Sequence, residues 1–378
     1  MTKIGVFSGN RAEYGLLKHL IKAINLDCNL ELQLFLSGSH LSKLYGETIN
    51  EVISDDIEPK ALIPLSIDKN PPSTMSYLTG EMMIGFEKVL REFEPEILIL
   101  LGDRYETFAA ASTSHLMQIP IIHIHGGETT LGAVDDKLRH AISQLSTWHF
   151  TAAPAYKQKL ISMGIEEKYI FQNGPMVIDG ILNCKNISKI EFENKIKYKF
   201  SEKNLLVTYH PETLCSNYGL EGLEALLKGI KEVGCNVLFT SPNADQGGDI
   251  ILKMIFEFVA LDPNRYFFNY SLGQNNYINA LKLFDGVAGN SSSGIIEAPL
   301  TNIPVLNIGN RQAGRIRLGK VYDVPSNFTK VKRGLDMIFE DSEKFKKKDK
   351  KIVNLKSPSL EIIKWINYQR HIGFGACL

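Results

Sequence analysis

Short runs of apolar, β-branched residues alternate with longer segments whose apolar positions recur at helical spacing in the first half of the chain. This alternation is typical of βαβ units that build a parallel sheet buried on both faces. The predicted strands are residues 4–8, 30–37, 97–101, 119–124 and 148–152. The predicted helices are residues 12–25, 77–93, 105–117 and 136–146.

The same alternation restarts after a lysine-rich, weakly patterned stretch at residues 183–203, which is either a domain boundary or a solvated helix. Further strands are expected at 205–209, 237–240, 266–270, 286–288 and 305–308. Further helices are expected at 220–232, 249–260, 274–284 and from Gly294 onward. The restart predicts an α/β protein with two Rossmann-like domains and a central cleft at the carboxyl ends of both sheets.

The expected limits are residues 1–180 for the first domain and 181–357 for the second. Residues 342–351 are charged enough to be a surface helix end or a linker. The amphipathic segment 360–368 is expected to fold back onto the first domain, together with the rest of 358–378.

Composition narrows the class of protein. The 378 residues suffice for two cores, and 42 basic against 42 acidic residues disfavour a nucleic-acid or anionic-membrane partner. The start MTKIGVFSGNR suggests a first strand rather than a signal peptide, and no apolar run reaches the ~20 residues that span a bilayer. Five scattered cysteines form no zinc or CxxC motif, so a cytoplasmic protein is expected.

The loop from Gly289 to Gly294 (GNSSSG) follows a predicted strand and opens a helix. Its backbone N–H groups and hydroxyls suit an anion such as a diphosphate, although a plain turn that caps a helix is the alternative. Glu297 can bind ribose hydroxyls or act as a helix-dipole partner. Arg311 and Arg315 follow the next strand and suit bidentate phosphate contact. The expected ligands in the loop are Asn290, Ser291, Ser292, Ser293 and Gly294.

Strand-end residues in the first half suggest both an anion site and an acidic site. Ser8-Gly9-Asn10-Arg11 ends the first strand and brings one cation, but it lacks the GxGxxG pattern, and the chain has no Walker A lysine motif. NAD-dependent hydride transfer and P-loop hydrolysis are therefore disfavoured. Asp103 follows an apolar strand and is expected beside a cation; the alternative is a salt-bridged structural aspartate.

The segment HIHGGE places His123, His125 and Glu128 after another strand, and the pair Asp135-Asp136 follows with Arg139 and His140. Strand alternation puts both histidines on one face, where a metal site is the alternative to close substrate approach past Gly126 and Gly127. His210 ends the first strand of the second half, and Asn243 lies after the next strand. Three carboxylate positions are thus expected to converge near one loop region.

In their order along the chain these loops closely resemble those of the hydrolysing UDP-N-acetylglucosamine 2-epimerases of bacterial sialic acid synthesis. The segments that carry the resemblance are GNRAEYGLL, SGSHLS, YGETI, LGDRYE, HIHGGETTLGAVDDKLRHAIS, YHPETL, SPNADQGG, GNSSSGIIEAP and NIGNRQAGRIR. The resemblance implies a GT-B-like fold, no metal or nicotinamide cofactor, and a homodimer or homotetramer. It also implies conversion of UDP-GlcNAc and water to N-acetylmannosamine and UDP.

The resemblance extends to the non-hydrolysing 2-epimerases, whose catalytic positions match Asp103, His210 and either Asp135 or Asp136. Many relatives carry a glutamate where this chain has His125, so Glu128 is the expected substitute. The substrate ligands expected in the first domain are Arg11, His40, Arg104, His125 and Arg139.

The expected chemistry is loss of UDP and of the C2 proton to give a 2-acetamidoglucal, followed by hydration. Asp103, Glu128 and Asp135 or Asp136 are assigned to proton transfer, and His210 to the leaving phosphate. UDP-2,4-diacetamido-2,4,6-trideoxyglucose, of legionaminic acid pathways, is the alternative substrate. A GT-B glycosyltransferase and a non-catalytic UDP-sugar sensor are the competing functions.

Overall fold

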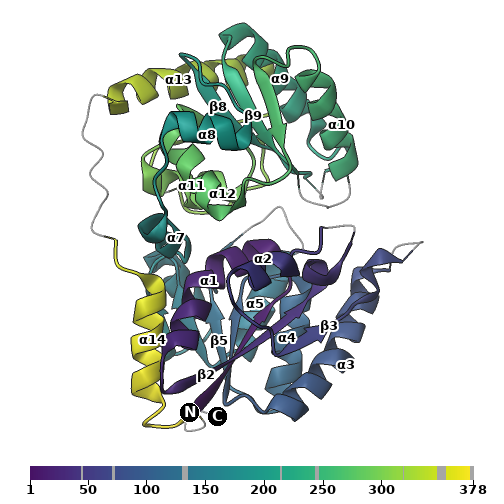
Figure 1. Cartoon of the computed structure of the whole chain (residues 1–378), viewed down its shortest axis with the longest axis vertical. Coiled ribbons are helices and arrows are strands. Elements are labelled where there is room, and N and C mark those ends of the chain that lie inside the picture. The colour runs from purple at the N-terminus through teal and green to yellow at the C-terminus, as the bar shows by residue number, and fades with distance from the viewer. Residues whose placement is uncertain are drawn as a thin grey trace. The chain divides into compact units, whose positions relative to one another are not determined.

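The computed structural model describes residues 1–43, 46–69, 73–129, 135–212, 215–242, 247–317, 319–346 and 355–374. The chain divides into two compact units (Figure 1). Unit 1 is formed by Met1–Glu128, Val134–Asp179 and Lys356–Leu378, and unit 2 chiefly by Gly180–Leu355. None of the described helices combines the length and apolar character needed to span a membrane.

Unit 1 is a parallel sheet with helices on both faces. Its strands are β1 (Thr2–Ser8), β2 (Leu30–Ser37), β3 (Ala61–Ile63), β4 (Ile97–Leu101), β5 (Ile121–Ile124), β6 (Trp148–Thr151) and β7 (Ile170–Gln172). They are ordered β3-β2-β1-β4-β5-β6-β7. Its helices are α1 (Arg11–Leu26), α2 (Ile49–Ser54), α3 (Met75–Phe93), α4 (Tyr105–Leu116), α5 (Asp135–Leu145), α6 (Pro154–Ser162) and α14 (Pro358–Gln369). Helix α7 (Val177–Asn183) begins in unit 1 and ends in the segment assigned to unit 2.

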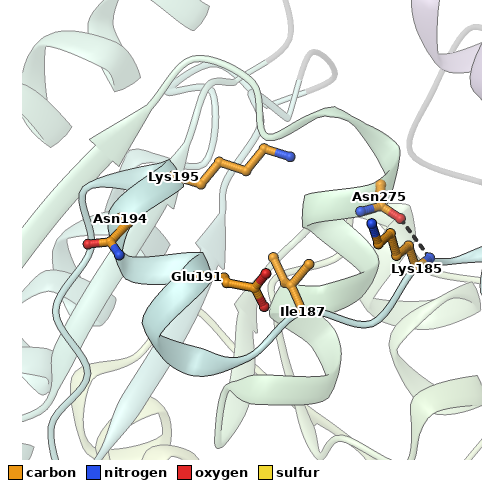
Figure 2. A pocket seen from close by; sticks show the side chains of 6 residues that line it. All are labelled: Lys185, Ile187, Glu191, Asn194, Lys195 and Asn275. Atoms are coloured by element: carbon orange, nitrogen blue, oxygen red, sulfur yellow. Dashed lines mark hydrogen bonds between the residues drawn. The ribbon is translucent and has the colours of Figure 1, made fainter.

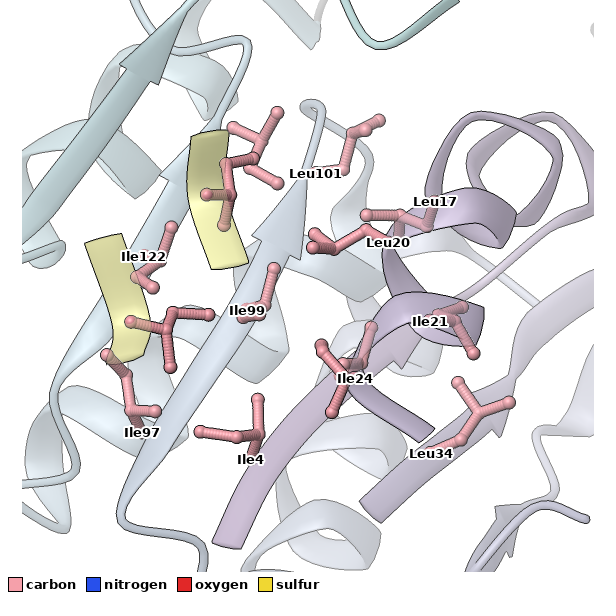
Figure 3. Close-up of a cluster of buried hydrophobic side chains, with 14 of the residues drawn as sticks. Ile4, Leu17, Leu20, Ile21, Ile24, Leu34, Ile97, Ile99, Leu101 and Ile122 are labelled. Carbon is pink, nitrogen blue, oxygen red and sulfur yellow. The ribbon is translucent and has the colours of Figure 1, made fainter. Parts of the chain in front are cut away.

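The two faces of this sheet bury alternate residues of the same strands. In β4, Ile97, Ile99 and Leu101 join one cluster with α1 and α14, whereas Leu98 and Leu100 join the cluster beneath α3, α4 and α5. Figure 3 shows α1 side chains lying against the strands in the first of these clusters. A continuous apolar run therefore marks a strand that is covered on both sides.

The C-terminal helix α14 lies beside α1 within unit 1, as the sequence predicts (Figure 1). Ile362 and Ile366 enter the core, and Trp365 packs 5.1 Å from Trp148, ring centre to ring centre. The buried carboxylate of Asp179 accepts hydrogen bonds from the Ser359 backbone N–H, at 3.0 Å, and from the hydroxyls of Ser357 and Ser359. Asp179 thus fixes the start of α14.

Unit 2 repeats this architecture. Its parallel sheet has the order β10-β9-β8-β11-β12-β13. The strands are β8 (Asn204–Thr208), β9 (Asn236–Thr240), β10 (Tyr266–Asn269), β11 (Gly286–Gly289), β12 (Val305–Ile308) and β13 (Val321–Val324). The helices are α8 (Lys189–Ile196), α9 (Leu220–Val233), α10 (Gly248–Val259), α11 (Gly273–Leu283), α12 (Ser292–Ile296) and α13 (Phe328–Lys346).

The lysine-rich stretch at 183–203 belongs to the core of unit 2. It contains α8, and fully buried Phe192 and nearly buried Tyr198 pack with Phe284 under the sheet. The many lysines between these apolar residues make their helical spacing difficult to recognise in the sequence. Residues 342–346 form the end of α13, so that part of the charged run is helical.

Candidate active site

Most candidate residues lie at the two points where strand order reverses. In unit 1 the order reverses between β1 and β4, and in unit 2 between β8 and β11. Parallel doubly wound sheets bind ligands outside the carboxyl ends of strands at such switch points. The loops that begin there carry Arg11 and Asp103 in unit 1, and His210 and Asn290 in unit 2.

The negative charges of three carboxylates of unit 1 act on the guanidinium of Arg139, and we call these four residues the carboxylate cluster. Arg139 is 3% exposed and forms an ion pair with Asp103. Burial opposes the charge of Arg139, but the negative charges of Asp103, Glu128 and Asp136 raise its pKa. The predicted convergence of acidic residues is therefore present in unit 1. Arg139 is their buried countercharge, and the assignment of its side chain as a substrate ligand stays a prediction.

Asp136 belongs to this cluster. Its carboxylate contributes to the raised pKa of Arg139 and lies 3.8 Å from His140 Nε2. Both aspartates open α5, where they are partly exposed. Of the two alternatives left open by the sequence, we favour Asp136 for chemistry.

His125 pairs with Glu128. Its Nε2 accepts a hydrogen bond from the Met176 backbone N–H at 3.1 Å, so the ring proton resides on Nδ1. That Nδ1 lies 3.2 Å from Glu128 Oε1, and Glu128 is 2% exposed. A neutral imidazole and a carboxylate thus stand together where many relatives have a single glutamate.

The expectation that His123 and His125 share one face is wrong. Strand β5 ends at Ile124, and His125 adopts a left-handed backbone with φ of 65°. His123 instead points into the unit, where both ring nitrogens are hydrogen bonded. Within the described residues, no group of three or more histidine, cysteine, aspartate or glutamate side chains is arranged to hold a metal ion.

The loop after β1 is held from within the protein. His40 is fully buried, with Nε2 3.0 Å from Ser8 Oγ and Nδ1 2.9 Å from Thr48 Oγ1. His40 therefore braces this loop, with both ring nitrogens engaged, and its assignment as a substrate ligand stays a prediction. Arg11 is exposed at the first position of α1, where it can meet an anion. Arg104 is partly exposed, with Nε 3.4 Å from Glu106 Oε2.

Glu13 is a site-adjacent residue that the sequence analysis missed. Its carboxyl group is buried, accepts a hydrogen bond from the Gly9 N–H at 2.7 Å and lies near Glu106. Burial, reinforced by the charge of Glu106, raises the pKa of Glu13 to about 8. A glutamate three residues after Asn10 resembles an ordinary capping position, so the sequence offered no distinctive signal.

Replacing Glu13 with glutamine is expected to stabilise the protein at alkaline pH. The folded-state pKa is raised to about 8 from an ordinary value of 4.5, so the stability contributed by the protonated form is lost as pH rises from 4.5 through 8. Each pKa unit corresponds to roughly 1.4 kcal/mol. Urea unfolding of Glu13→Gln and wild type should give equal midpoints near pH 4.5 and a higher midpoint for the variant above pH 8. Exposed Glu92→Gln is the control. Parallel pH curves for Glu13→Gln and wild type would contradict the prediction.

Asn290 joins the three loops after β8, β11 and β12, which we call the unit 2 loop cluster. Its side chain, fully buried, accepts from His210 N at 2.7 Å and donates to His210 O at 2.8 Å. Its backbone carbonyl oxygen accepts hydrogen bonds from Arg311 Nη1 at 3.3 Å and from Gln312 Nε2 at 2.9 Å. Asn290 therefore positions these loops, and its assignment as a ligand stays a prediction.

Gly289 allows the close approach on which this arrangement depends. Its φ is 136°, and a Cβ there would lie 2.0 Å from the carbonyl oxygen of Thr208. The glycine is therefore required by the passage of β8 rather than by an anion.

The serines after Asn290 are partly used within the protein. Ser291 Oγ lies 3.3 Å from His210 Nε2 and 3.1 Å from Ser293 Oγ, and Ser293 also contacts the Tyr277 hydroxyl. Burial and the nearby Arg311 hold the pKa of His210 well below its ordinary value, so this ring is neutral at pH 7. His210 is therefore suited to hydrogen bonding more than to donating an imidazolium proton.

Helix α12 begins at Ser292, two residues earlier than expected, because Ser291 caps it. It spans five residues and ends at Ile296, and the next residue, Glu297, caps it. Loss of hydration raises the pKa of Glu297 to about 7. Ser292 is partly exposed. Gly294 is buried, and a Cβ added to it would lie 3.2 Å from Val305 Cγ1.

The loop after β12 presents two arginines and is braced by a third. Arg311 and Arg315 are partly exposed, as expected of anion ligands. Arg317 pairs with Asp323 at 2.8 Å and donates to the carbonyls of Gln312 and Arg315. Arg317 was not singled out by the sequence analysis. Asn243 lies outside the described residues.

A surface depression on unit 2 involves none of the predicted site residues (Figure 2). It is lined by Lys185, Ile187, Glu191, Asn194, Lys195 and Asn275. Asn275 accepts a hydrogen bond from the Lys185 backbone, and Glu191 completes a capping box with Ser188. Asn275 and Glu191 therefore stabilise the local backbone of this depression.

Comparisons with known proteins find similar sequences over most of the chain. A Campylobacter jejuni protein named GDP/UDP-N,N'-diacetylbacillosamine 2-epimerase (hydrolyzing) is 34% identical over 347 residues, covering 91% of this chain and 88% of that protein. A Legionella pneumophila protein named UDP-N,N'-diacetylbacillosamine 2-epimerase (hydrolyzing) is 34% identical over 333 residues, covering 88% of each.

The fold is also found among solved structures. The crystal structure of the Neisseria meningitidis UDP-GlcNAc 2-epimerase bound to UDP-GlcNAc matches with a TM-score of 0.79 and 20% identity, covering 97% of this chain and 100% of that one. This likeness supports a GT-B-like fold of two Rossmann-like units. The family model described as UDP-N-acetylglucosamine 2-epimerase matches residues 22–358. The chain therefore belongs to the UDP-N-acetylglucosamine 2-epimerase family.

Proposed function

We propose that this protein is a hydrolysing 2-epimerase that converts UDP-N,N'-diacetylbacillosamine and water to UDP and 2,4-diacetamido-2,4,6-trideoxymannose. This substrate is UDP-2,4-diacetamido-2,4,6-trideoxyglucose, the alternative in the sequence analysis. The names of two relatives at 34% identity favour it over UDP-GlcNAc. UDP-GlcNAc, with N-acetylmannosamine as product, is the second candidate because the matching family model is described by that sugar.

The observation that carries the proposal is the carboxylate cluster of unit 1. The negative charges of Asp103, Glu128 and Asp136 act on one buried arginine, which keeps several negative charges together at the end of the sheet. An elimination followed by hydration needs two differently placed acid–base groups and a negative field for a cationic C1. The cluster supplies both features.

In the proposed reaction, the C1–O bond breaks and its electron pair leaves with UDP. The C2 proton passes to a carboxylate, and the C–H electrons form the C1=C2 bond of a 2-acetamidoglucal. Water then adds its oxygen to C1 while C2 receives a proton on the opposite face. We assign the proton transfers to Asp103, Asp136 and the His125–Glu128 pair.

We assign UDP to the unit 2 loop cluster. Arg311, Arg315 and Ser292, all partly exposed, are assigned to the diphosphate, and the carboxyl of Glu297 is assigned to the ribose hydroxyls. Neutral His210 would donate a hydrogen bond to the leaving phosphate. In unit 1, exposed Arg11 adds a further positive charge at the end of β1.

The test is incubation with each UDP-sugar in D₂O without any acceptor, followed by NMR of the products. The proposal expects free manno-configured sugar, deuterium at C2 and one UDP per sugar released, with the diacetamido substrate faster. A UDP-manno sugar without UDP release would identify a non-hydrolysing epimerase. Binding without turnover of either sugar would identify a sensor, and transfer only on addition of an acceptor would identify a glycosyltransferase.

A further inference from the structure

His123 connects two segments of the carboxylate cluster without belonging to it. It is fully buried in β5, and its Nε2 lies 2.8 Å from the carbonyl oxygen of Gly102, directly before Asp103. Its Nδ1 lies 3.0 Å from Ser143 Oγ. Ser143 lies one turn after Arg139 on α5, the helix that also carries Asp136. One ring therefore spans the two segments.

The proton positions on this ring follow from its partners. A carbonyl oxygen only accepts, so Nε2 carries the proton and donates to Gly102. Burial lowers the pKa of His123 to about 4, and the ring is neutral at pH 7. Nδ1 is then an acceptor for the Ser143 hydroxyl, whose oxygen also lies 3.1 Å from the Arg139 backbone carbonyl, so the two acceptors share one hydroxyl proton. Both bonds are directional and lie away from water.

The ring has little room to move. A Cβ on Gly126 would lie 3.0 Å from both His123 Nδ1 and Ser143 Oγ. On the next strand, His149 stands at the paired position and packs edge to face, 6.4 Å from the His123 ring centre. His149 is equally buried, but neither of its nitrogens forms a well-aligned hydrogen bond within the described residues, and burial outweighs the weak effect of the Ser146 backbone on its pKa. Comparing variants of His123 and His149 therefore distinguishes the effect of losing hydrogen bonds from the effect of changing a buried ring.

We propose that His123 is a positioning residue that holds the Asp103 loop and helix α5 in register, so that Asp103 and Asp136 reach the sugar together. The inference rests on the proposed function, since it concerns the groups assigned to proton transfer. His123 itself does not touch the substrate. Displacing reacting groups by about 1 Å can cost on the order of 100-fold in rate.

The experiment compares His123→Leu, His123→Gln and the matched control His149→Leu. His123→Leu should lower kcat roughly 10- to 100-fold with KM and UDP affinity within about threefold of wild type. His123→Gln retains a donor for Gly102 and should recover most of the rate. His149→Leu should keep wild-type kcat. If His123→Leu folds poorly, Ser143→Ala removes the other bond and should lower kcat three- to tenfold.

Hydrogen exchange by mass spectrometry provides a readout that needs no turnover. In His123→Leu, exchange should rise at residues 102–105 and along α5, and the same segments should stay protected in His149→Leu. An unchanged kcat in His123→Leu, or an equal loss in both leucine variants, would overturn the inference. If wild type turns over neither UDP-sugar, the proposed function fails, and the exchange pattern alone then decides the positioning role.

Discussion

Asp103→Asn is expected to reduce turnover about 100- to 10,000-fold while leaving UDP binding within about threefold of wild type. Asparagine nearly matches aspartate in shape, but it neither accepts the C2 proton nor carries the charge that stabilises a cationic C1. The loops to which we assign UDP belong to unit 2, so the affinity for UDP is not expected to fall together with turnover. Single-turnover assays and calorimetric titration with UDP measure the two effects.

Loss of the Asp103 charge also removes one partner of buried Arg139, so stability has to be measured alongside activity. Glu128 and Asp136 remain as countercharges, and we expect the fold to persist. Asp27→Asn is the matched control. Asp27 precedes β2 and so lies at the amino ends of the strands, whereas Asp103 lies at their carboxyl ends. Wild-type turnover in Asp103→Asn would falsify the assignment, and an equal loss in Asp27→Asn would show a general effect.

Asp179→Ala is expected to lower the free energy of unfolding of unit 1 by roughly 2–4 kcal/mol. Its carboxylate accepts hydrogen bonds from Ser357 and Ser359, and the buried Ser359 N–H would lose its acceptor. Helix α14 would then detach more readily from α1.

Tryptophan fluorescence during urea unfolding can measure this effect. Both tryptophans of the chain, Trp148 and Trp365, lie in the contact between α14 and the sheet. Ser359→Ala removes one of the hydroxyl partners and should give a smaller shift in the same direction. Asp55→Asn, at a pair with Lys18 and Lys22 elsewhere in unit 1, is the control for loss of a charge. An unchanged midpoint in Asp179→Ala would contradict the prediction.

The sequence predicted the central strands well because they are buried on both faces, as residues 97–101 show. It missed β3, β7 and β13, which have three or four residues and depend on a neighbouring strand for their hydrogen bonds. It also began β5 too early, at residue 119 rather than at Ile121. Pro120 provides its carbonyl to Leu98 but has no N–H to donate to a ladder.

The candidate site was predictable in its positions and less so in its roles. Strand-end placement located Asp103 and Glu128, since those positions follow from the alternation alone. The internal hydrogen bonds of His40 and Asn290 required the tertiary structure, because their partners lie 32 and 80 residues away. Local sequence cannot distinguish a polar residue that binds a ligand from one that binds a neighbouring loop.

The division of the chain between the units sets an order of completion during synthesis. Unit 2 is formed chiefly by Gly180–Leu355, whereas unit 1 includes α14, which follows that segment in the chain. Although domains generally fold from the N-terminus first on the ribosome, the N-terminal sheet here cannot be fully covered until α14 has been synthesised. Until then, the side chains of α1 and of the strands that pack with Ile362 and Ile366 lack part of their apolar covering.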